Sequence, residues 1–196
     1  MPHSMESREG PGCGTKAGDP PPGKQEKESR LKSSMHIRPA TPEDVPEMLA
    51  LIRELAEYER EPKAVEATEA DLLRDGFGPS PRFSALVADE AGSTAGLALY
   101  FYNWSTWRGR AGIHLEDLFV RPAFRGRGIG KALLAAVAVV AVEKGCARLQ
   151  WDVLEWNQPA IDFYQSLGAK FLDQWRIMRV TDDALPNLAG TSERLP

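Results

Sequence analysis

Residues 118–131 read Leu118-Phe-Val-Arg-Pro-Ala-Phe-Arg-Gly-Arg-Gly-Ile-Gly-Lys131, and this stretch decides the fold that we expect. The apolar residues at 113–120 predict a strand, the glycines a tight turn, and the apolar run at 132–142 a buried helix. The start of a helix leaves backbone N–H groups available, and these attract phosphates. The stretch therefore predicts a phosphate-binding turn. A lone glycine-rich loop is more often a surface loop with solvated arginines.

The glycine spacing excludes two familiar phosphate loops. A dinucleotide-binding fingerprint needs G-x-G-x-x-G, whereas the glycines here run G-x-G-x-G. A P-loop needs glycine where Arg125 stands and serine or threonine where Ala132 stands. A dinucleotide-binding module is therefore disfavoured.

Strand and helix signals alternate around this stretch. Helices are signalled by caps at Thr41, Thr68 and Asn157. Strands are expected at 36–38, 83–88, 95–101, 113–120 and 149–154, with a final hairpin at 171 and 175–180. This interleaving predicts an α/β fold in which helices cover the faces of a mixed sheet.

Length and composition fit one globular domain. The chain has 196 residues, 42% hydrophobic and 27% charged, which excludes a fibrous or wholly disordered protein. Residues 1–34 hold almost no aliphatic or aromatic side chains beyond Leu31. We therefore expect a disordered N-terminal extension over 1–34 and a single domain over 35–196.

Charge and rare residue types limit the partners. The net charge of −4 argues against a nucleic-acid partner. The apolar run at 132–142 is too short to cross a bilayer, and the start lacks an apolar signal-peptide core, so we expect a cytoplasmic protein with no membrane partner. Two cysteines and three histidines without ligand spacing predict no metal site.

The glycine turn resembles a known signature. Arg125-x-x-Gly128-x-Gly130 is similar to the (Q/R)-x-x-G-x-(G/A) motif of the GNAT superfamily of N-acetyltransferases. The resemblance implies the GNAT fold, a mostly antiparallel twisted sheet with helices on both faces, and a turn whose main-chain amides bind the pyrophosphate of acetyl-CoA. The cofactor-binding residues that it implies are Leu118, Phe119, Val120, Arg125, Gly126, Arg127, Gly128, Ile129, Gly130 and Lys131.

A second motif, Asn157-Gln-Pro-Ala-Ile-Asp-Phe-Tyr164, looks like the family's next helix. The resemblance implies that Asn157 contacts the pantetheine arm and that Tyr164 binds the cofactor and protonates the departing thiolate. The alternative is that Tyr164 is a core aromatic, because Ile161, Tyr164 and Leu167 share one helix face.

A closer resemblance, to the diamine acetyltransferase branch, covers about residues 36–170. That branch includes spermidine/spermine and thialysine acetyltransferases. Tyr58-Glu59, Leu115-Glu-Asp117 and Glu155-Trp-Asn157 are among the segments that carry it. The substrate-binding residues that it implies are Tyr58, Glu59, Glu116, Gln150, Trp151 and Asp152.

Carboxylates suit a cationic acceptor, since fixed negative charges lower the cost of desolvating an ammonium group. Glu116 interrupts an apolar strand, so we expect its charge to be buried and name it as the candidate base. Glu59 is either a ligand or part of a solvated charged segment.

The resemblance thus implies acetyl transfer from acetyl-CoA to a primary amine of a small polyamine- or diamine-like substrate, by a homodimer. Two alternatives stay open. In the first, the enzyme acetylates an amino acid, an aminoglycoside-like amine or a protein amino group. In the second, the protein binds acetyl-CoA as a regulator and catalyses no reaction.

Overall fold

A computed structural model of the chain describes residues 35–191. The disordered extension expected over 1–34 lies outside the described residues. The chain divides into two compact units, one ending at Trp151 and one beginning at Asp152, and each is described by itself.

One five-stranded sheet organises the first unit of the described chain, with its strands in sequence order. The strands are β1 (His36–Pro39), β2 (Ser84–Glu90), β3 (Ser93–Ser105), β4 (Arg110–Val120) and β5 (Leu149–Gln150). The first four pair antiparallel, and β5 pairs parallel to β4 through Ile113–Leu149 and His114–Gln150. The mixed, mostly antiparallel sheet expected from the sequence is confirmed.

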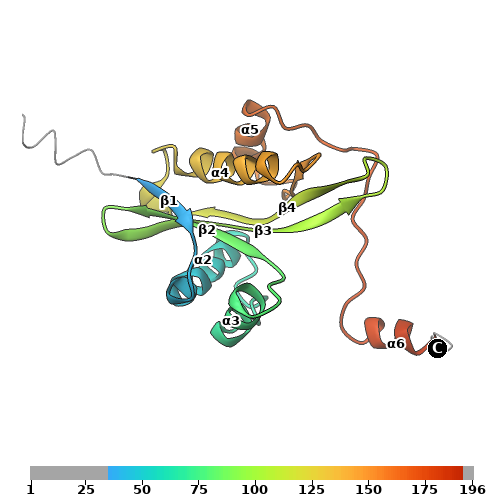
Figure 1. The fold of residues 1–196 in the computed structure, drawn as a ribbon. Coiled ribbons are helices and arrows are strands. Elements are labelled where there is room, and N and C mark those ends of the chain that lie inside the picture. The colour runs from blue at the N-terminus through green and yellow to red at the C-terminus, as the bar shows by residue number, and fades with distance from the viewer. Residues whose placement is uncertain (1–34, 192–196) are drawn as a thin grey trace, which may run out of the picture. The chain divides into compact units, whose positions relative to one another are not determined.

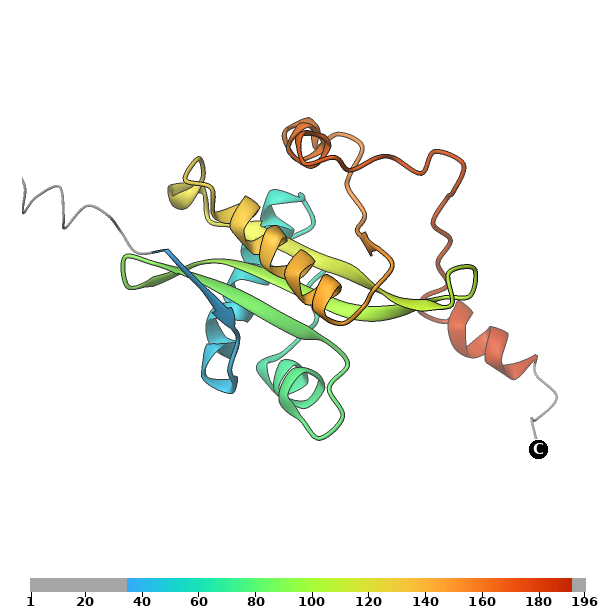
Figure 2. The same cartoon turned by 45° about the horizontal axis from the view of Figure 1, so that its top comes forward.

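Helices cover both faces of this sheet, as expected (Figures 1 and 2). Helices α2 (Val45–Tyr58) and α3 (Glu69–Phe77) lie on one face, and α4 (Ile129–Glu143) lies on the other. The core under α2 is fully apolar and comprises Val45, Met48, Leu49, Leu51, Leu72, Ala85, Val87, Leu97 and Phe119. Burial of these apolar side chains packs α2 against the sheet, where it contacts both β3 and β4.

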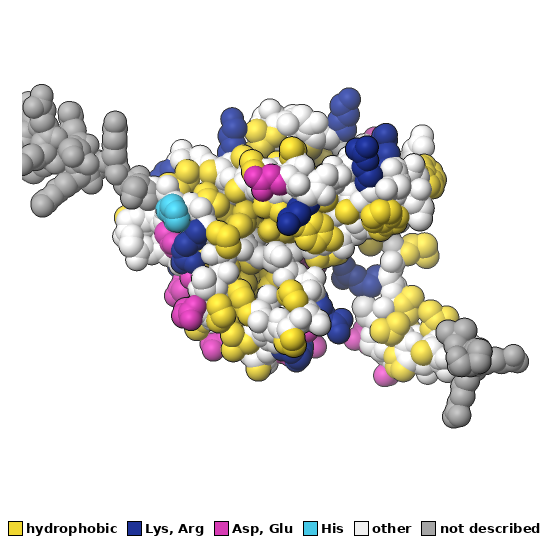
Figure 3. Space-filling model, in the orientation of Figure 1, with side chains coloured by type: hydrophobic (Ala, Val, Ile, Leu, Met, Phe, Trp, Pro, Cys, Tyr) yellow, Lys and Arg dark blue, Asp and Glu magenta, His cyan; other side chains and the backbone are white. Residues whose placement is uncertain are grey.

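Only one side of α4 is buried, which corrects the expectation of a buried helix. Leu133 and Val137 are fully buried, whereas Val139 and Val142 are 54% and 79% exposed. The space-filling view shows apolar side chains reaching the surface among charged ones on the face that it draws (Figure 3). No helix within residues 35–191 is both long enough and apolar enough to cross a membrane.

An ion-pair network joins β1 to the start of α2. The helix is preceded by a short 3-10 turn, η1 (Pro42–Asp44), and Arg38 contacts both Asp44 at 2.6 Å and Asp89 at 2.7 Å. The hydrogen bonds from Arg38 lower the pKa of Asp44 to about 2. The ion pairs of Arg38 therefore hold η1, the turn predicted from the Thr41 cap, against the edge of the sheet.

The second unit contains α5 (Gln158–Ser166) and α6 (Ala184–Gly190). The final hairpin expected at 171 and 175–180 is wrong, because the chain has no strand there. The strand expected at 149–154 is also shorter, since only Leu149 and Gln150 pair. Alternating apolar residues are a local signal, whereas a strand needs a partner for its backbone groups.

Candidate functional site

A β-bulge in β4 organises the site. Leu99 of β3 pairs with Asp117, and the next residue, Tyr100, pairs with Leu115. Glu116 is therefore an extra residue with no opposite partner on β3. A bulge bends the strand and redirects its side chains. Glu116 and Asp117 therefore point in directions that the regular alternation of the strand would not give them.

The bulge brings His114 and Asp117 to the same face of the sheet. His114 pairs with Phe101 and Asp117 pairs with Leu99, and these two β3 residues are two positions apart. Directly opposite residues share a face, and alternate residues of a strand share a face. Phe119, in the core under α2, lies on that face as well. The site therefore faces the C-terminal end of α2.

Two other carboxylates, those of Glu116 and Glu59, lie within electrostatic reach of Asp117. Burial, together with the charges of Glu116 and Glu59, raises the pKa of Asp117 to about 6. Burial also raises the pKa of Glu59, which directly follows the last residue of α2. Glu59 is half-buried rather than part of a solvated charged segment. Carboxylates that are costly to ionise alone are suited to a cationic ligand.

The less exposed carboxylate of the pair is that of Asp117, which is half-buried, and not that of Glu116. The side chain of Glu116 is 54% exposed, which corrects the expectation that it is buried. The reason is the bulge, because strict strand alternation cannot show which residue is inserted. An exposed carboxylate is the more accessible to an incoming amine, so Glu116 stays the candidate base.

The sequence reasoning missed His114. Its Nε2 lies 3.6 Å from Oε2 of Glu116, and its Nδ1 lies 3.5 Å from Nε2 of Gln150. The ring also stacks on Phe101, with centroids 5.0 Å apart. The available signal was a histidine two residues before the acidic pair on a strand. Of the described residues, no group of three or more His, Cys, Asp or Glu could hold a metal ion.

The glycine turn has the backbone that its sequence indicates. Gly126 and Gly128 have φ of 75° and 83°, a left-handed conformation that side chains disfavour. Gly128 caps α4, and a Cβ atom there would meet nothing within 4 Å. The turn therefore leaves open space beside the helix N-terminus, where backbone N–H groups attract anions.

The two arginines of the turn contact the protein. Arg125 donates from Nε to the carbonyl of Val120 at 2.9 Å, and its guanidinium lies 4.8 Å from the centre of the Tyr58 ring. Arg127 donates to the carbonyl of Ala123 and lies 3.7 Å from Glu90. The alternative of a turn with freely solvated arginines does not describe Arg125. Lys131 is exposed on the first turn of α4.

The edge of β4 that faces β5 is open over its last residues. Among residues 35–191, β5 pairs with β4 at Ile113 and His114 only. Leu118, Phe119 and Val120 thus have a ladder partner on the β3 side alone. This open edge runs directly into the glycine turn.

The remaining expected residues lie in or next to the second unit. Trp151 ends the first unit, and Asp152 begins the second. Asn157 caps α5, and its side chain accepts a hydrogen bond from the backbone N–H of Ala160. Tyr164 lies on α5 with its ring 5.2 Å from that of Phe163. The roles of Asn157 and Tyr164 stay predictions.

Comparison with known proteins identifies the family. The protein-family model described as "Acetyltransferase (GNAT) family" matches residues 46–169 of the sequence. These residues include the acidic face, the glycine turn and α5. The chain belongs to the GNAT acetyltransferase family. It is therefore an acetyltransferase of a family that uses acetyl-CoA.

Relatives of this GNAT protein cover most of its length. A thialysine N-epsilon-acetyltransferase of Bos taurus is 42% identical over 165 residues, which are 79% of this chain and 96% of the relative. An L-ornithine N5-acetyltransferase of Arabidopsis thaliana is 32% identical and covers 76% of this chain and 85% of the relative. A solved integron cassette protein from the mobile metagenome of V. cholerae has 28% identity and a TM-score of 0.68, covering 80% of this chain and 98% of its own.

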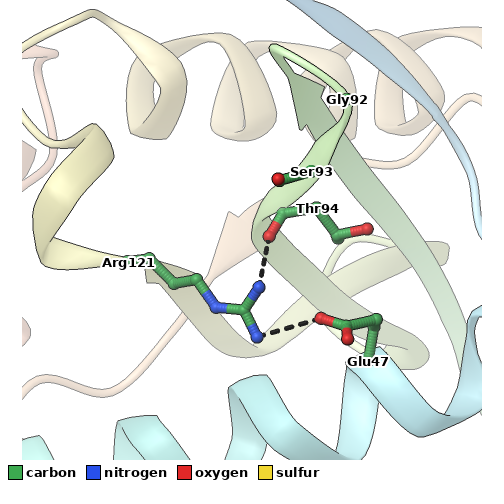
Figure 4. Close-up of a pocket in the computed structure, with 5 residues that line it drawn as sticks. All are labelled: Glu47, Gly92, Ser93, Thr94 and Arg121. Atoms are coloured by element: carbon green, nitrogen blue, oxygen red, sulfur yellow. Dashed lines mark hydrogen bonds and ion pairs between the residues drawn. The ribbon is translucent and has the colours of Figure 1, made fainter.

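A polar pocket elsewhere on the first unit of the GNAT domain has a structural explanation (Figure 4). It is lined by Glu47, Gly92, Ser93, Thr94 and Arg121. Arg121 donates to the carbonyl of Thr94 at 2.8 Å and pairs with Glu47 and Glu54 at 2.9 Å. Two carboxylates compensate its charge, so the arginine links the β2–β3 turn to α2 rather than offering an anion site.

Proposed function

We propose that this GNAT enzyme acetylates a primary amine of a small polyamine- or diamine-like molecule. The observation that carries the proposal is the acidic face formed by Glu59, Glu116 and Asp117 between the end of α2 and the bulge of β4. Fixed negative charge on a partly desolvated face favours a substrate with a second positive charge over a neutral or anionic one.

Glu116 is the residue proposed to accept the proton of the substrate amine. An alkylamine has a pKa near 10.4, so at neutral pH it arrives protonated and cannot attack. The exposed carboxylate of Glu116, directly or through water, takes this proton. Asp117 and Glu59 hold the remaining positive charge, and Tyr58, the residue before Glu59, is proposed to line the same space.

The neutral amine then attacks the thioester carbonyl of acetyl-CoA. Backbone amides at Leu118–Val120, on the open edge of β4, are proposed to hold the carbonyl oxygen as it gains charge. The pyrophosphate is proposed to lie on the glycine turn at residues 125–131, where positive-φ glycines leave space beside the start of α4. Asn157 is proposed to contact the pantetheine arm, and Tyr164 to protonate the sulfur as the C–S bond breaks.

The names of the relatives support a terminal amine. Thialysine N-epsilon-acetyltransferase and L-ornithine N5-acetyltransferase both denote acetylation of a side-chain nitrogen. These names also favour a second candidate, an amino acid with a side-chain amine. Such a substrate adds a carboxylate, which the acidic face would disfavour unless a basic group receives it.

A thiol-release assay with acetyl-CoA tests the proposal. The acceptors are spermidine, putrescine, thialysine, lysine, free amino acids without a side-chain amine, and an aminoglycoside. We expect kcat/KM to be highest for a molecule with two amino groups and no turnover of amino acids that have only an α-amino group. Acetyl-CoA binding without release of thiol for any amine would instead indicate a non-catalytic regulator.

A further inference from the structure

We propose that His114 is a positioning residue that holds the carboxylate of Glu116 toward the substrate amine, with Gln150 fixing the histidine ring. The inference rests on the proposed function, since it assigns a partner to Glu116. It adds a residue that lies outside the sequence motifs of the family.

The ring of His114 is restrained on three sides. It stacks on Phe101 at a centroid distance of 5.0 Å and an interplanar angle of 25°. The amide nitrogen of Gln150 lies 3.5 Å from Nδ1, and Oε2 of Glu116 lies 3.6 Å from Nε2. The side chain of His114 is 16% exposed, whereas that of Glu116 is 54% exposed. A restrained ring therefore stands beside a carboxylate that is otherwise open to solvent.

The contact with Gln150 selects the ring nitrogen that carries the proton. An amide nitrogen can only donate, so with this orientation of Gln150 the Nδ1 atom accepts. A neutral imidazole then carries its proton on Nε2, which is the nitrogen nearest to Glu116. In this tautomer the histidine presents its Nε2–H to the carboxylate.

A neutral donor is what the electrostatics of this face require. Besides His114, the titratable group next to Glu116 is Asp117 on the same strand, and the charges of both Glu116 and Glu59 act on Asp117. The negative charge of Asp117 repels Glu116 and would turn it toward solvent. A lysine or arginine partner would hold Glu116 but would cancel the negative charge that attracts the amine. The N–H of His114 restrains Glu116 and leaves the charge of the face unchanged.

His114→Phe separates this role from packing. Phenylalanine keeps a ring for the stack on Phe101 and removes both nitrogens. We expect kcat/KM for the preferred amine to fall about tenfold, as for coupled neighbours, with KM for acetyl-CoA and the melting temperature nearly unchanged. His36→Phe, which changes a histidine of β1, is the matched control and should change none of these values. His114→Gln, which restores an N–H donor, should recover most of the loss.

A double-mutant cycle with Glu116→Gln decides the inference. If His114 acts through Glu116, then His114→Phe costs almost nothing further in the Glu116→Gln background. A loss from His114→Phe that is equal in both backgrounds overturns the inference while leaving Glu116 as the base. Glu116→Gln with wild-type amine kinetics overturns both this inference and the proposed role of Glu116. If His114→Phe does not fold, the same cycle is run with His114→Gln and His114→Leu. The inference then predicts a loss for leucine only.

Discussion

The guanidinium of Arg125 lies 4.8 Å from the centre of the Tyr58 ring, and 5.5 Å from that of Phe119. The contact joins the turn proposed to bind acetyl-CoA to the helix end proposed to bind the acceptor. Each half of the site therefore restrains the other. Cation–π contacts of this kind are worth about 0.5–1 kcal/mol at exposed positions, or roughly a twofold to fivefold change in affinity.

Replacing Tyr58 by leucine should weaken both substrates. Tyr58→Leu removes the ring under Arg125, so we expect KM for acetyl-CoA to rise about twofold to fivefold, together with KM for the amine. Tyr58→Phe keeps the ring and should leave KM for acetyl-CoA near the wild-type value. Steady-state kinetics with each substrate varied in turn measures both. A Tyr58→Leu enzyme with an unchanged KM for acetyl-CoA would show that the stacking does not support the turn.

The glycine turn should be sensitive at Gly128. Its φ of 83° and the open space beside it mean that valine there strains the backbone and places a side chain where the pyrophosphate is proposed to lie. We expect the affinity for acetyl-CoA to fall at least tenfold, about 1.4 kcal/mol. The affinity, measured by calorimetry, should change far more than KM for the amine.

Gly145→Val is the matched control for this variant. Gly145 follows the other end of α4, has φ of 65° and also has open space around it. Valine there carries a similar backbone strain with no proposed ligand nearby. Both variants should lose melting temperature, and only Gly128→Val should lose acetyl-CoA affinity. Equal affinities in the two variants would remove the phosphate site from the turn.

Asp117 should make the protein less stable as the pH rises. Its folded pKa of about 6 lies above the ordinary aspartate pKa of 3.8, so the folded state binds the proton more tightly than the unfolded state. The resulting stabilisation is complete below pH 3.8 and is lost as the pH rises through 6. Asp117→Asn is neutral at every pH, so it should raise the free energy of unfolding by about 1–3 kcal/mol at pH 8 and change it little at pH 4.

Thermal melts from pH 4 to pH 8 check this expectation, with Asp173→Asn as an exposed aspartate for comparison. The preferred amine should raise the melting temperature of the wild type at pH 8 more than that of Asp117→Asn, because the amine compensates a charge that the variant lacks. Parallel melting curves for the wild type and Asp117→Asn across this pH range would contradict the assignment of a buried, unfavourable charge.

The sequence predicted what local patterns encode. The glycine turn, the apolar stripe of α2 and the antiparallel pairing of β2 with β3 follow from periodicity and caps, and the structure has all of them. The bulge at Glu116 could not be predicted, because an inserted residue leaves the composition of the strand unchanged and only the partner strand reveals it. That insertion left Glu116 exposed, against the expectation, and brought Asp117 to the same face of the sheet as His114.

The lengths of the strands also could not be predicted from the pattern of apolar residues. Residues 149–154 alternate as strands do and residues 175–180 are rich in apolar side chains, yet the first segment pairs over two residues and the second forms no strand. Pairing depends on where a backbone edge is available, which residues distant in sequence decide. The roles expected for Asn157 and Tyr164 depend in the same way on distant partners, so they require kinetics.

Tyr164→Phe is the test on which the chemical mechanism depends most. The change deletes one hydroxyl and keeps the ring beside Phe163 on α5. If Tyr164 is the general acid, kcat should fall by roughly 10²-fold, the usual range for losing a positioned proton donor. The affinity for acetyl-CoA should barely change, because the proton is needed only as the C–S bond breaks. If the residue is a core aromatic, kcat should stay near wild type and stability should shift by about 1 kcal/mol at most.

Measuring kcat, both KM values and the melting temperature together separates these cases. Tyr102→Phe is the matched control, since it removes a tyrosine hydroxyl from β3 at a side chain that is 46% exposed. A thiolate leaves fairly well without a proton, so the loss in Tyr164→Phe should shrink as the pH rises toward the pKa of the thiol and the thiolate itself becomes the stable product. Single-turnover kinetics shows whether the chemical step limits the rate. With chemistry limiting, a folded Tyr164→Phe enzyme that keeps the wild-type kcat would leave the sulfur without its proposed proton donor, and protonation by water would take its place.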